Sequence, residues 1–242
     1  MYNKSSLLFV LLLLSFLSCA KEPSPEVSAL PAWITLFDGE TFDGWKGYNS
    51  DVIPEKWGIE DGAIYVSKEG NSPDENTGFG RSIMTVETFE NFELELDYRI
   101  SYGGNSGIMY HVVESDKYDD DYDTGPEFQI IDDLYFQNKI PAKQLTASNF
   151  DVLAPDSLPL NSPFLWNRIK LVYVNGLVEH WVNGKKVLEF TEGSTEWEEA
   201  VNNSKWVNGE FPDWSKSTSG HISLQDHGDF VQFRNIRIRP IE

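Results

Sequence analysis

The chain has 242 residues, 40% of them apolar, which is enough material for one large β domain or for two small domains. Asp and Glu number 39 against 19 Lys and Arg, so the formal net charge is -20. A field of that sign argues against nucleic acid and against anionic membrane surfaces as partners, whereas neutral sugars and metal cations suit it. For most of these carboxylates, solubility is a sufficient explanation.

The N-terminal residues have the pattern of an export signal. Lys4 precedes an apolar run over residues 7–14, which is too short for a membrane span and typical of a secretory signal peptide. The pattern predicts a signal peptide over residues 1–18 that is absent from the mature fold.

The only cysteine, Cys19, follows this run and cannot form an internal disulfide bond. Its position resembles a bacterial lipoprotein cleavage site, although Phe16 stands where an aliphatic residue is usual. We therefore expect an exported cell-envelope lipoprotein that meets the membrane only through a lipid on Cys19, with residues 19–32 as a proline-containing tether. The alternative is an ordinary signal peptide with an incidental thiol.

Residues 33–242 are expected to form one all-β domain. Apolar and charged residues alternate strictly over residues 92–100, which predicts a strand with one face in the core and the other in solvent. The dipeptides Asp61-Gly62, Asn175-Gly176 and Asn183-Gly184 each separate two alternating runs and predict tight hairpins, the last two within a three-stranded meander over residues 164–190. Many short strands with little helix favour two antiparallel sheets packed as a sandwich or jelly roll.

Two regions break this pattern. Residues 134–163 show no sustained period and contain three prolines, so we expect a long surface excursion. Residues 196–205 have the best helical composition. Near the C-terminus, Ile222 and Leu224 alternate with polar residues, and a second strand follows from Val231, which predicts a closing hairpin with a bulge at Arg234-Asn235.

A polar strand lies in the middle of the chain. In residues 125–132, Glu127, Gln129 and Ile131 share one face, and a charged group beside an amide there suggests the floor of a polar site. Gly103, Gly104 and Gly107 precede it and let the backbone pass close to another group.

Six segments in order carry a family resemblance: LFDG at 36–39, GNSGI at 104–108, TGPEFQIID at 124–132, WVNG at 181–184, LQDHG at 224–228 and FRNIRI at 233–238. Together they resemble the 3-keto-disaccharide hydrolase family, over nearly all of the chain after residue 33. The resemblance implies the concanavalin A-like version of the sandwich, in which a concave sheet receives sugars.

The chemistry that the resemblance implies is cleavage of 3-keto-glycosides. An ordinary glycosidase needs two carboxyl groups around the scissile bond, and only Glu127 qualifies here, because Gln129 stands at the partner position. A ketone at C3 acidifies the C2 proton, so elimination followed by hydration gives net hydrolysis with one base, one acid and a group that stabilises the enolate. We expect Glu127, His111 and His227 to transfer protons, with the assignment of base and acid open.

The expected substrate-binding residues are Gln129, Gln225, Asn105, Lys143 and Trp181. Each has a structural alternative: His111 suits a core position, Asp226 and His227 suit a turn, and Asn105 suits a glycine-rich loop. A different class of function, a carbohydrate-binding module with Trp45, Trp57 and Trp181 as sugar platforms, also stays open.

No paired-cysteine metal site, phosphate loop or Ser-His-Asp order is present, and no certain cofactor is expected. Asp119, Asp120, Asp121 and Asp123 crowd one loop, where like charges repel. Either solvent or a divalent cation such as calcium relieves this repulsion.

Overall fold

Two antiparallel sheets make up the part of the chain that the computed structural model describes, namely residues 31–67, 81–207 and 209–241. The predicted signal peptide, the lipid on Cys19 and nearly all of the tether lie outside these residues, as does most of a predicted polar loop over residues 68–79. No helix in the described ranges is long and apolar enough to cross a membrane.

The larger sheet has eight strands. Seven follow the order β11-β10-β9-β6-β13-β4-β3, and the eighth, β1, pairs with residues 237–238 of β13, beyond the residues that pair with β4. Its strands are β1 Ile34–Thr35, β3 Trp57–Glu60, β4 Ala63–Val66, β6 Phe92–Ile100, β9 Asn167–Val174, β10 Leu177–Val182, β11 Lys185–Thr191 and β13 Val231–Pro240.

The smaller sheet has five strands in the order β2-β5-β12-β7-β8. They are β2 Trp45–Gly47, β5 Ile83–Thr85, β7 Asn105–Val112, β8 Glu127–Ile131 and β12 His221–Leu224. The short helices are η1 Asp121–Asp123, α1 Asp133–Phe136, η2 Ala142–Gln144, α2 Thr195–Val201 and η3 Lys205–Val207.

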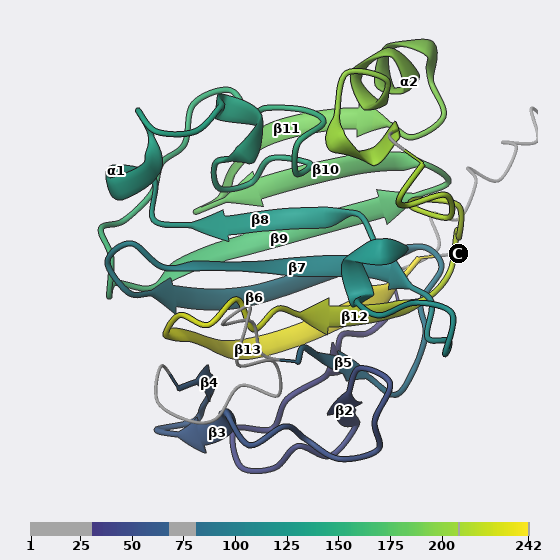
Figure 1. Cartoon of the computed structure of the whole chain (residues 1–242). Helices are drawn as coiled ribbons and strands as arrows, with labels where there is room; N and C mark the ends of the chain where they lie inside the picture. The colour runs from purple at the N-terminus through teal and green to yellow at the C-terminus, as the bar shows by residue number, and fades with distance from the viewer. Residues whose placement is uncertain (1–30, 68–80, 208, 242) are drawn as a thin grey trace, which may run out of the picture. The chain divides into compact units, whose positions relative to one another are not determined.

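Figure 1 shows the sheets as two layers, with β8, β7 and β12 in front of β9, β6 and β13. The core lies between the layers because alternate residues of both sheets point inward: Leu94 and Leu96 from β6 are fully buried, as are Ile108 from β7 and Phe128 from β8. The predicted all-β sandwich is confirmed.

The turn dipeptides form the predicted tight turns. Asp61 and Gly62 have φ values of 51° and 72° and join β3 to β4, while Asn175 and Gly176 have φ values of 50° and 87° and join β9 to β10. A positive φ at both central residues matches the right-handed twist of the flanking strands, so the three hairpins, including the one at Asn183-Gly184, are confirmed.

The predicted closing hairpin is wrong, because its two strands do not pair with each other. β12 pairs with β5 and β7 in the smaller sheet, whereas β13 pairs with β4 and β6 in the larger one. The LQDHG segment between them therefore crosses from one layer to the other. The predicted bulge is present, because the register of β13 shifts between Arg234 and Arg237 and Asn235 has a φ of 54°.

The outward face of β6 is not simply solvated. Glu93 and Asp97 on that face are buried, and both form ion pairs with cations of the neighbouring strands: Arg168 and Arg234 with Asp97, and Arg239 with Glu93. Cross-strand pairing replaces the water that the alternating pattern predicts on this face.

The excursion over residues 134–163 is only partly a surface segment. Residues 146–149 are fully buried, and they run beside β8, where the Ala147 amide donates to the Gln129 carbonyl at 2.8 Å and the Gln129 amide donates to Ser148 at 3.3 Å. These bonds cover the edge of β8. Helix α2 lies within the segment of predicted helical composition apart from its first residue.

Candidate active site

A polar pocket of about 270 Å³ opens on the outer face of the smaller sheet. Its floor comes from residues of β7, β8 and the end of β12 that alternate with the core residues of the same strands, and its rim comes from η1 and the segment after α2. The lining consists of Ser82, Asn105, Asp120, Asp121, Tyr122, Glu127, Gln129, Phe150, Lys205, Phe211, Gln225, Asp226 and His227.

Five predicted site residues meet here, from three motifs of the chain: Asn105, Glu127, Gln129, Gln225 and His227. Gln225 follows β12, and its backbone amide donates to the Gly107 carbonyl at 3.0 Å, which places the LQDHG segment beside β7. The structure therefore brings together residues up to 122 positions apart in the sequence on one surface, as the shared strand phase predicts.

Glu127 lies directly over Gly107. A Cβ atom added to Gly107 would stand 2.0 Å from Glu127 Oε1 and 2.8 Å from its Cδ, far inside contact distance. Residues 107 and 109 of β7 pair with residues 129 and 127 of β8, so the missing side chain of Gly107 creates the space that the carboxyl group fills. The close backbone approach predicted for this glycine is confirmed.

The surroundings of Glu127 favour the protonated form of its carboxyl group. Burial raises its pKa well above the usual range, the positive charge of Lys205 opposes that shift, and the negative charge of Asp121 adds to it. A carboxyl group that keeps its proton near neutral pH can act as a general acid.

His227 has the opposite tendency. Burial lowers the pKa of its imidazole, although the negative charge of Asp229 opposes this shift. A neutral imidazole has a lone pair that accepts a proton, so His227 suits the role of a general base. The pocket thus holds two titratable groups whose pKa values shift in opposite directions.

Three buried oxygens of the pocket residues have no hydrogen-bond partner in the described part of the chain: Asn105 Oδ1, Gln225 Oε1 and Asp226 Oδ2. The other oxygen of Asp226 accepts from the Gly228 amide at 2.8 Å. An unpaired buried acceptor costs about 1–3 kcal/mol, and these three oxygens have the capacity to accept hydrogen bonds from hydroxyl or amine donors of a ligand.

Gln129, by contrast, is bound to the protein. Its Oε1 accepts from the Ile130 amide at 2.9 Å, and its Nε2 donates to the Gln144 carbonyl at 3.4 Å. The Gln144 side chain donates to Asp151 at 2.7 Å, and Asp151 in turn accepts from the backbone amide of Lys205 at 2.8 Å. Gln129 therefore fixes the rim of the pocket relative to its floor.

The aspartate-rich loop folds over the pocket as η1. Asp121 is buried, where burial raises its pKa to about 6, and hydrogen bonds from Ser223 and Ser82 oppose that shift. Asp123 accepts from the amides of Asp119 and Asp120 at 3.0 and 3.2 Å. These carboxylates therefore accept hydrogen bonds from backbone amides of their own loop and from serine hydroxyls of the smaller sheet and the segment before β5.

A divalent cation is the other predicted way to relieve the repulsion between these aspartates. Among the residues that the structure describes, no group of three or more His, Cys, Asp and Glu side chains is arranged to hold a metal ion. Hydrogen bonds from backbone amides contact the Asp121 and Asp123 carboxylates in this loop.

Aromatic residues form the side of the pocket that faces the floor: Tyr122, Phe150 and Phe211. Behind them, the rings of Trp197, Trp214 and Trp206 stack in series, with centroid separations of 5.9 and 4.7 Å. The sequence provides no periodicity over residues 206–214 that predicts this wall, because its residues come from a loop that only the tertiary structure folds back.

His111 does not lie in the site, and its predicted catalytic position is wrong. The side chain is buried and packs 4.3 Å from the Tyr173 ring, while its Nε2 donates to the Glu90 carbonyl at 2.8 Å. Burial lowers its pKa to about 4. With a φ of 53°, His111 interrupts the alternation of β7, so its ring joins the core.

Lys143 and Trp181 are also misplaced. Lys143 forms an ion pair with Asp151 at 3.4 Å and donates to the Asn203 carbonyl at 2.9 Å, away from the pocket lining. Trp181 lies on the outer face of β10 in the other sheet, 4.2 Å from Lys170 Nζ and bonded to Glu179 at 2.8 Å. Lys205, which the sequence analysis missed, is the lysine of the pocket.

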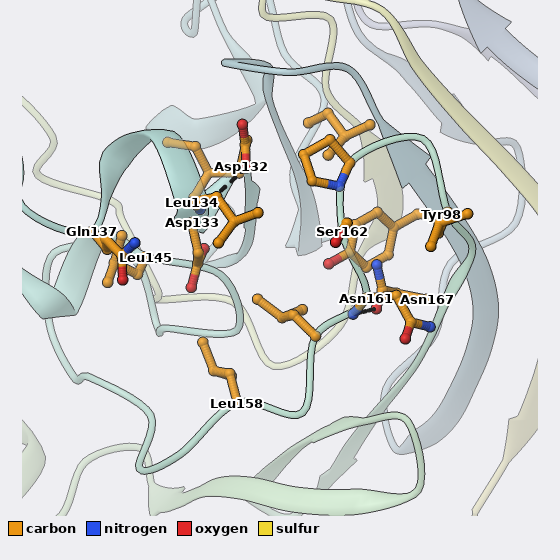
Figure 2. Close-up of a pocket in the computed structure, with 15 residues that line it drawn as sticks. Tyr98, Asp132, Asp133, Leu134, Gln137, Leu145, Leu158, Asn161, Ser162 and Asn167 are labelled. Atoms are coloured by element: carbon orange, nitrogen blue, oxygen red, sulfur yellow. Dashed lines mark hydrogen bonds between the residues drawn. The ribbon is translucent and has the colours of Figure 1, made fainter.

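A second pocket, of about 340 Å³, lies under the excursion and is larger, but its aspartates and asparagines form hydrogen bonds within the protein. Figure 2 shows Asp133 and Leu158 pointing into it and the Asn161 amide bonded to the Asn167 side chain. Asp133 accepts from the Thr146 amide at 3.0 Å, and Asp132 accepts from Leu134 and Gly103. None of the described residues that line this second pocket has an unpaired buried acceptor, whereas three such acceptors occur at the Glu127 pocket, which is therefore the candidate active site.

Known proteins resemble this chain over most of its length. A curated relative, the 3-keto-disaccharide hydrolase of Bacteroides thetaiotaomicron, is 36% identical over 234 residues, which cover 87% of this chain and 79% of the relative. A crystal structure of a candidate glycosyl hydrolase from Parabacteroides distasonis superposes with a TM-score of 0.76 at 36% identity, covering 87% of this chain and 94% of the other.

More distant structures share only the fold. The β-glucanase of Bacillus licheniformis superposes with a TM-score of 0.50 at 12% identity, over 89% of this chain and all of the other. This likeness is to a glucanase jelly roll, as the predicted concanavalin A-like sandwich requires. The family described as the 3-keto-alpha-glucoside-1,2-lyase-like domain matches residues 32–239, and the chain belongs to this family.

Proposed function

We propose that the protein cleaves the glycosidic bond of 3-keto-glycosides by elimination, with hydration completing a net hydrolysis. The observation that carries the proposal is the pair of opposed proton-transfer groups in one pocket, Glu127 with a raised pKa and His227 with a lowered one. The hydrolase relative and the glycosyl hydrolase fold neighbour support a carbohydrate substrate.

The reaction follows from these two groups. Neutral His227 takes the proton from C2, and the C2–H electron pair becomes an enolate across C2, C3 and the ketone oxygen. The enolate then re-forms the ketone, a C1–C2 double bond forms, and the aglycone oxygen leaves C1 with the proton of Glu127. Water adds at C1 and a proton returns to C2, which yields the free 3-keto sugar.

The unpaired acceptors explain how the sugar is held. Asn105 Oδ1, Gln225 Oε1 and Asp226 Oδ2 accept hydrogen bonds, and sugar hydroxyls donate them. A site with unsatisfied buried acceptors rejects ligands that lack the matching donors, since those acceptors would stay unpaired. The pocket therefore binds a hydroxyl-rich ring.

A pure carbohydrate-binding module fits less well. Two of its three predicted sugar platforms are buried and bonded within the protein: Trp45 Nε1 donates to Leu36 and Trp57 Nε1 donates to Arg81. Trp181 lies on β10 of the larger sheet, whereas the pocket is on the smaller sheet. The tryptophans therefore do not form one binding platform.

The test uses a 3-keto-glucoside, the matching unoxidised glucoside and the C2-deuterated 3-keto-glucoside. The proposal expects aglycone release from the keto substrate only, with slower release or loss of the label on deuteration. Equal turnover of both glucosides would indicate a conventional glycosidase, and binding without turnover would indicate a binding module.

The leaving group tests the assignment of acid and base. Glu127→Gln removes the acid, so cleavage of sugar aglycones should fall by about 10²–10⁴-fold, whereas a nitrophenolate leaves without a proton and should be cleaved far better by the same variant. His227→Ala should lose both substrates alike, together with exchange of the C2 proton. The reverse pattern would exchange the two roles.

A further inference from the structure

Lys205 is held at the rim of the pocket by a set of aromatic rings. Its Nζ lies 4.2 Å from the ring centroid of Trp206, 4.6 Å from that of Phe150 and 5.7 Å from that of Tyr122. The residue as a whole is exposed, yet its ammonium group lies among these rings, whose faces attract a cation. The aromatic rings therefore fix the position of the Lys205 positive charge at the rim of the pocket.

The backbone of Lys205 is fixed as well. Its amide donates to Asp151 Oδ2 at 2.8 Å, and Asp151, a residue with a φ of 61°, also accepts from Gln144 at 2.7 Å. Gln144 joins this set to Gln129 on β8, two residues after Glu127. The cation of Lys205, at the start of η3, is thus connected through Asp151 and Gln144 to the strand that holds Glu127.

No other Lys or Arg occurs among the pocket residues. The negative charges of Asp151 and Glu210 favour the ammonium form of Lys205, although burial has the larger effect and lowers its pKa. The proposed elimination places a negative charge on the ketone oxygen, and the floor of the pocket offers that oxygen only amides and acids. Lys205 can supply the missing positive charge.

We propose that Lys205 is a catalytic residue whose ammonium group donates a hydrogen bond to the C3 oxygen of the substrate and stabilises the enolate. This inference rests on the proposed function. When the C2–H pair moves into the C2–C3 bond, the carbonyl π pair moves to the C3 oxygen beside Lys205. The proton goes to the base, and Lys205 keeps its own protons throughout. Lys205 also makes the site selective for a ketone, because a C3 hydroxyl develops no such charge.

Lys143 provides a matched control. It lies beside the same aspartate, at 3.4 Å from Asp151, but it does not line the pocket. Lys143→Met and Lys205→Met remove the same charge from the same neighbourhood, and only the second removes it from the substrate. A merely structural contribution to Asp151 would appear in both variants.

The experiment measures C2 proton exchange in D₂O and aglycone release from a 3-keto-glucoside, with melting temperature as the control for folding. Lys205→Met should lower both rates together by about 10²–10³-fold, the size expected for losing one preorganised group at a developing oxyanion. Lys205→Arg, which keeps the charge, should recover part of this loss. Lys143→Met should keep the wild-type rates, and inhibition by the unoxidised glucoside should be unchanged in all three variants.

Three results would overturn the inference: exchange at the wild-type rate in Lys205→Met, an equal loss in Lys143→Met, or a substrate adduct on Lys205 after borohydride treatment, which would show a covalent role. Failure of the function itself is a separate result, because the wild-type protein would then neither exchange the C2 proton nor cleave the keto substrate.

Discussion

The outer faces of the two sheets both carry buried carboxyl groups, and they use them in opposite ways. On the larger sheet, Asp97 binds Arg168 at 2.8 Å and Asn235 at 2.7 Å, and Glu93 pairs with Arg239. On the smaller sheet, Glu127 and Asp226 lie at a pocket whose buried acceptors are partly unpaired. Paired carboxylates stabilise a fold, whereas unpaired ones cost stability and remain available to a ligand.

The pKa directions express the same difference. Burial alone would raise the pKa of Asp97, but the hydrogen bonds from Arg168 and Asn235 outweigh it, and the pKa is lower than usual. Burial raises the pKa of Glu127, and Lys205 only partly opposes it. The larger sheet therefore favours the charged form and the smaller sheet the neutral form.

The largest expected effect is on Glu127. Glu127→Gln keeps the shape of the side chain but removes the acid, so kcat for a 3-keto-disaccharide should fall by about 10²–10⁴-fold while the folded state stays intact. Steady-state kinetics with circular dichroism measure both. A variant that unfolds instead would place Glu127 with the structural carboxylates and break the comparison.

Gly107→Ala should lower the catalytic activity nearly as much as Glu127→Gln does. The added Cβ would lie 2.0 Å from Glu127 Oε1, so the carboxyl group must move, and about 10²-fold of activity should be lost through misplacement of the acid. Combined with Glu127→Gln, the second change should add little further loss, because the group it displaces has no acid proton left to deliver. Additive losses would show that Gly107 acts elsewhere.

Asp97→Asn should affect stability and not catalysis. It weakens charged hydrogen bonds to Arg168 and Asn235, so the free energy of unfolding should fall by about 1.5–3 kcal/mol, as denaturant titration measures. At temperatures where the variant is folded, its kcat should equal that of the wild type. A loss of kcat would mean that the two faces are coupled.

The pH dependence should have opposite signs on the two faces. The lowered pKa of Asp97 means that its stabilisation is present above about pH 4 and is lost as the pH falls through the folded-state pKa. The raised pKa of Glu127 means that the wild type loses stability, relative to Glu127→Gln, as the pH rises from about 4.5 toward the folded-state pKa. Parallel unfolding curves of both proteins from pH 3 to 9 would contradict the second expectation.

The smallest effect concerns a single unpaired acceptor. Gln225→Leu removes Oε1 and with it one hydrogen bond to a sugar hydroxyl, so KM should rise by about 3–10-fold with little change in kcat, since about 1 kcal/mol of binding is lost. The free protein should be no less stable, because the lost atom had no partner there. A drop in melting temperature would show a structural use of this amide.

Local signals predicted much of the fold. Strict alternation over β6 and the positive φ values required by Asn-Gly and Asp-Gly act within a few residues, so the strands and tight hairpins follow from the chain itself. The closing hairpin failed because a turn signal says where a strand ends, not which sheet the next strand joins. Gly228, with a φ of 87°, does lie in a turn, but this turn belongs to the connection between the two sheets and not to a hairpin.

The residues of the candidate site also divide into those that local sequence signals predict and those that they do not. The alternation in the sequence places Glu127 and Gln129 on one face of their strand and Gln225 in the polar phase of another strand. The three side chains meet in the pocket. His111 left it because a positive φ inside β7 turned its ring away, and no periodicity announces such a break. Lys205 replaced Lys143 because Asp151 binds both residues and the aromatic rings hold only one of them at the pocket.

The position of β13 has a consequence for how the protein folds. This last strand lies inside the larger sheet, between β6 and β4, and its pair Glu93 and Arg239 are 146 residues apart. Until β13 is synthesised, the edges of β6 and β4 that it joins remain open, and open strand edges promote intermolecular pairing. Contacts this distant in sequence form slowly, so we expect the LQDHG segment, which lines the pocket and directly precedes β13, to become ordered only late in folding.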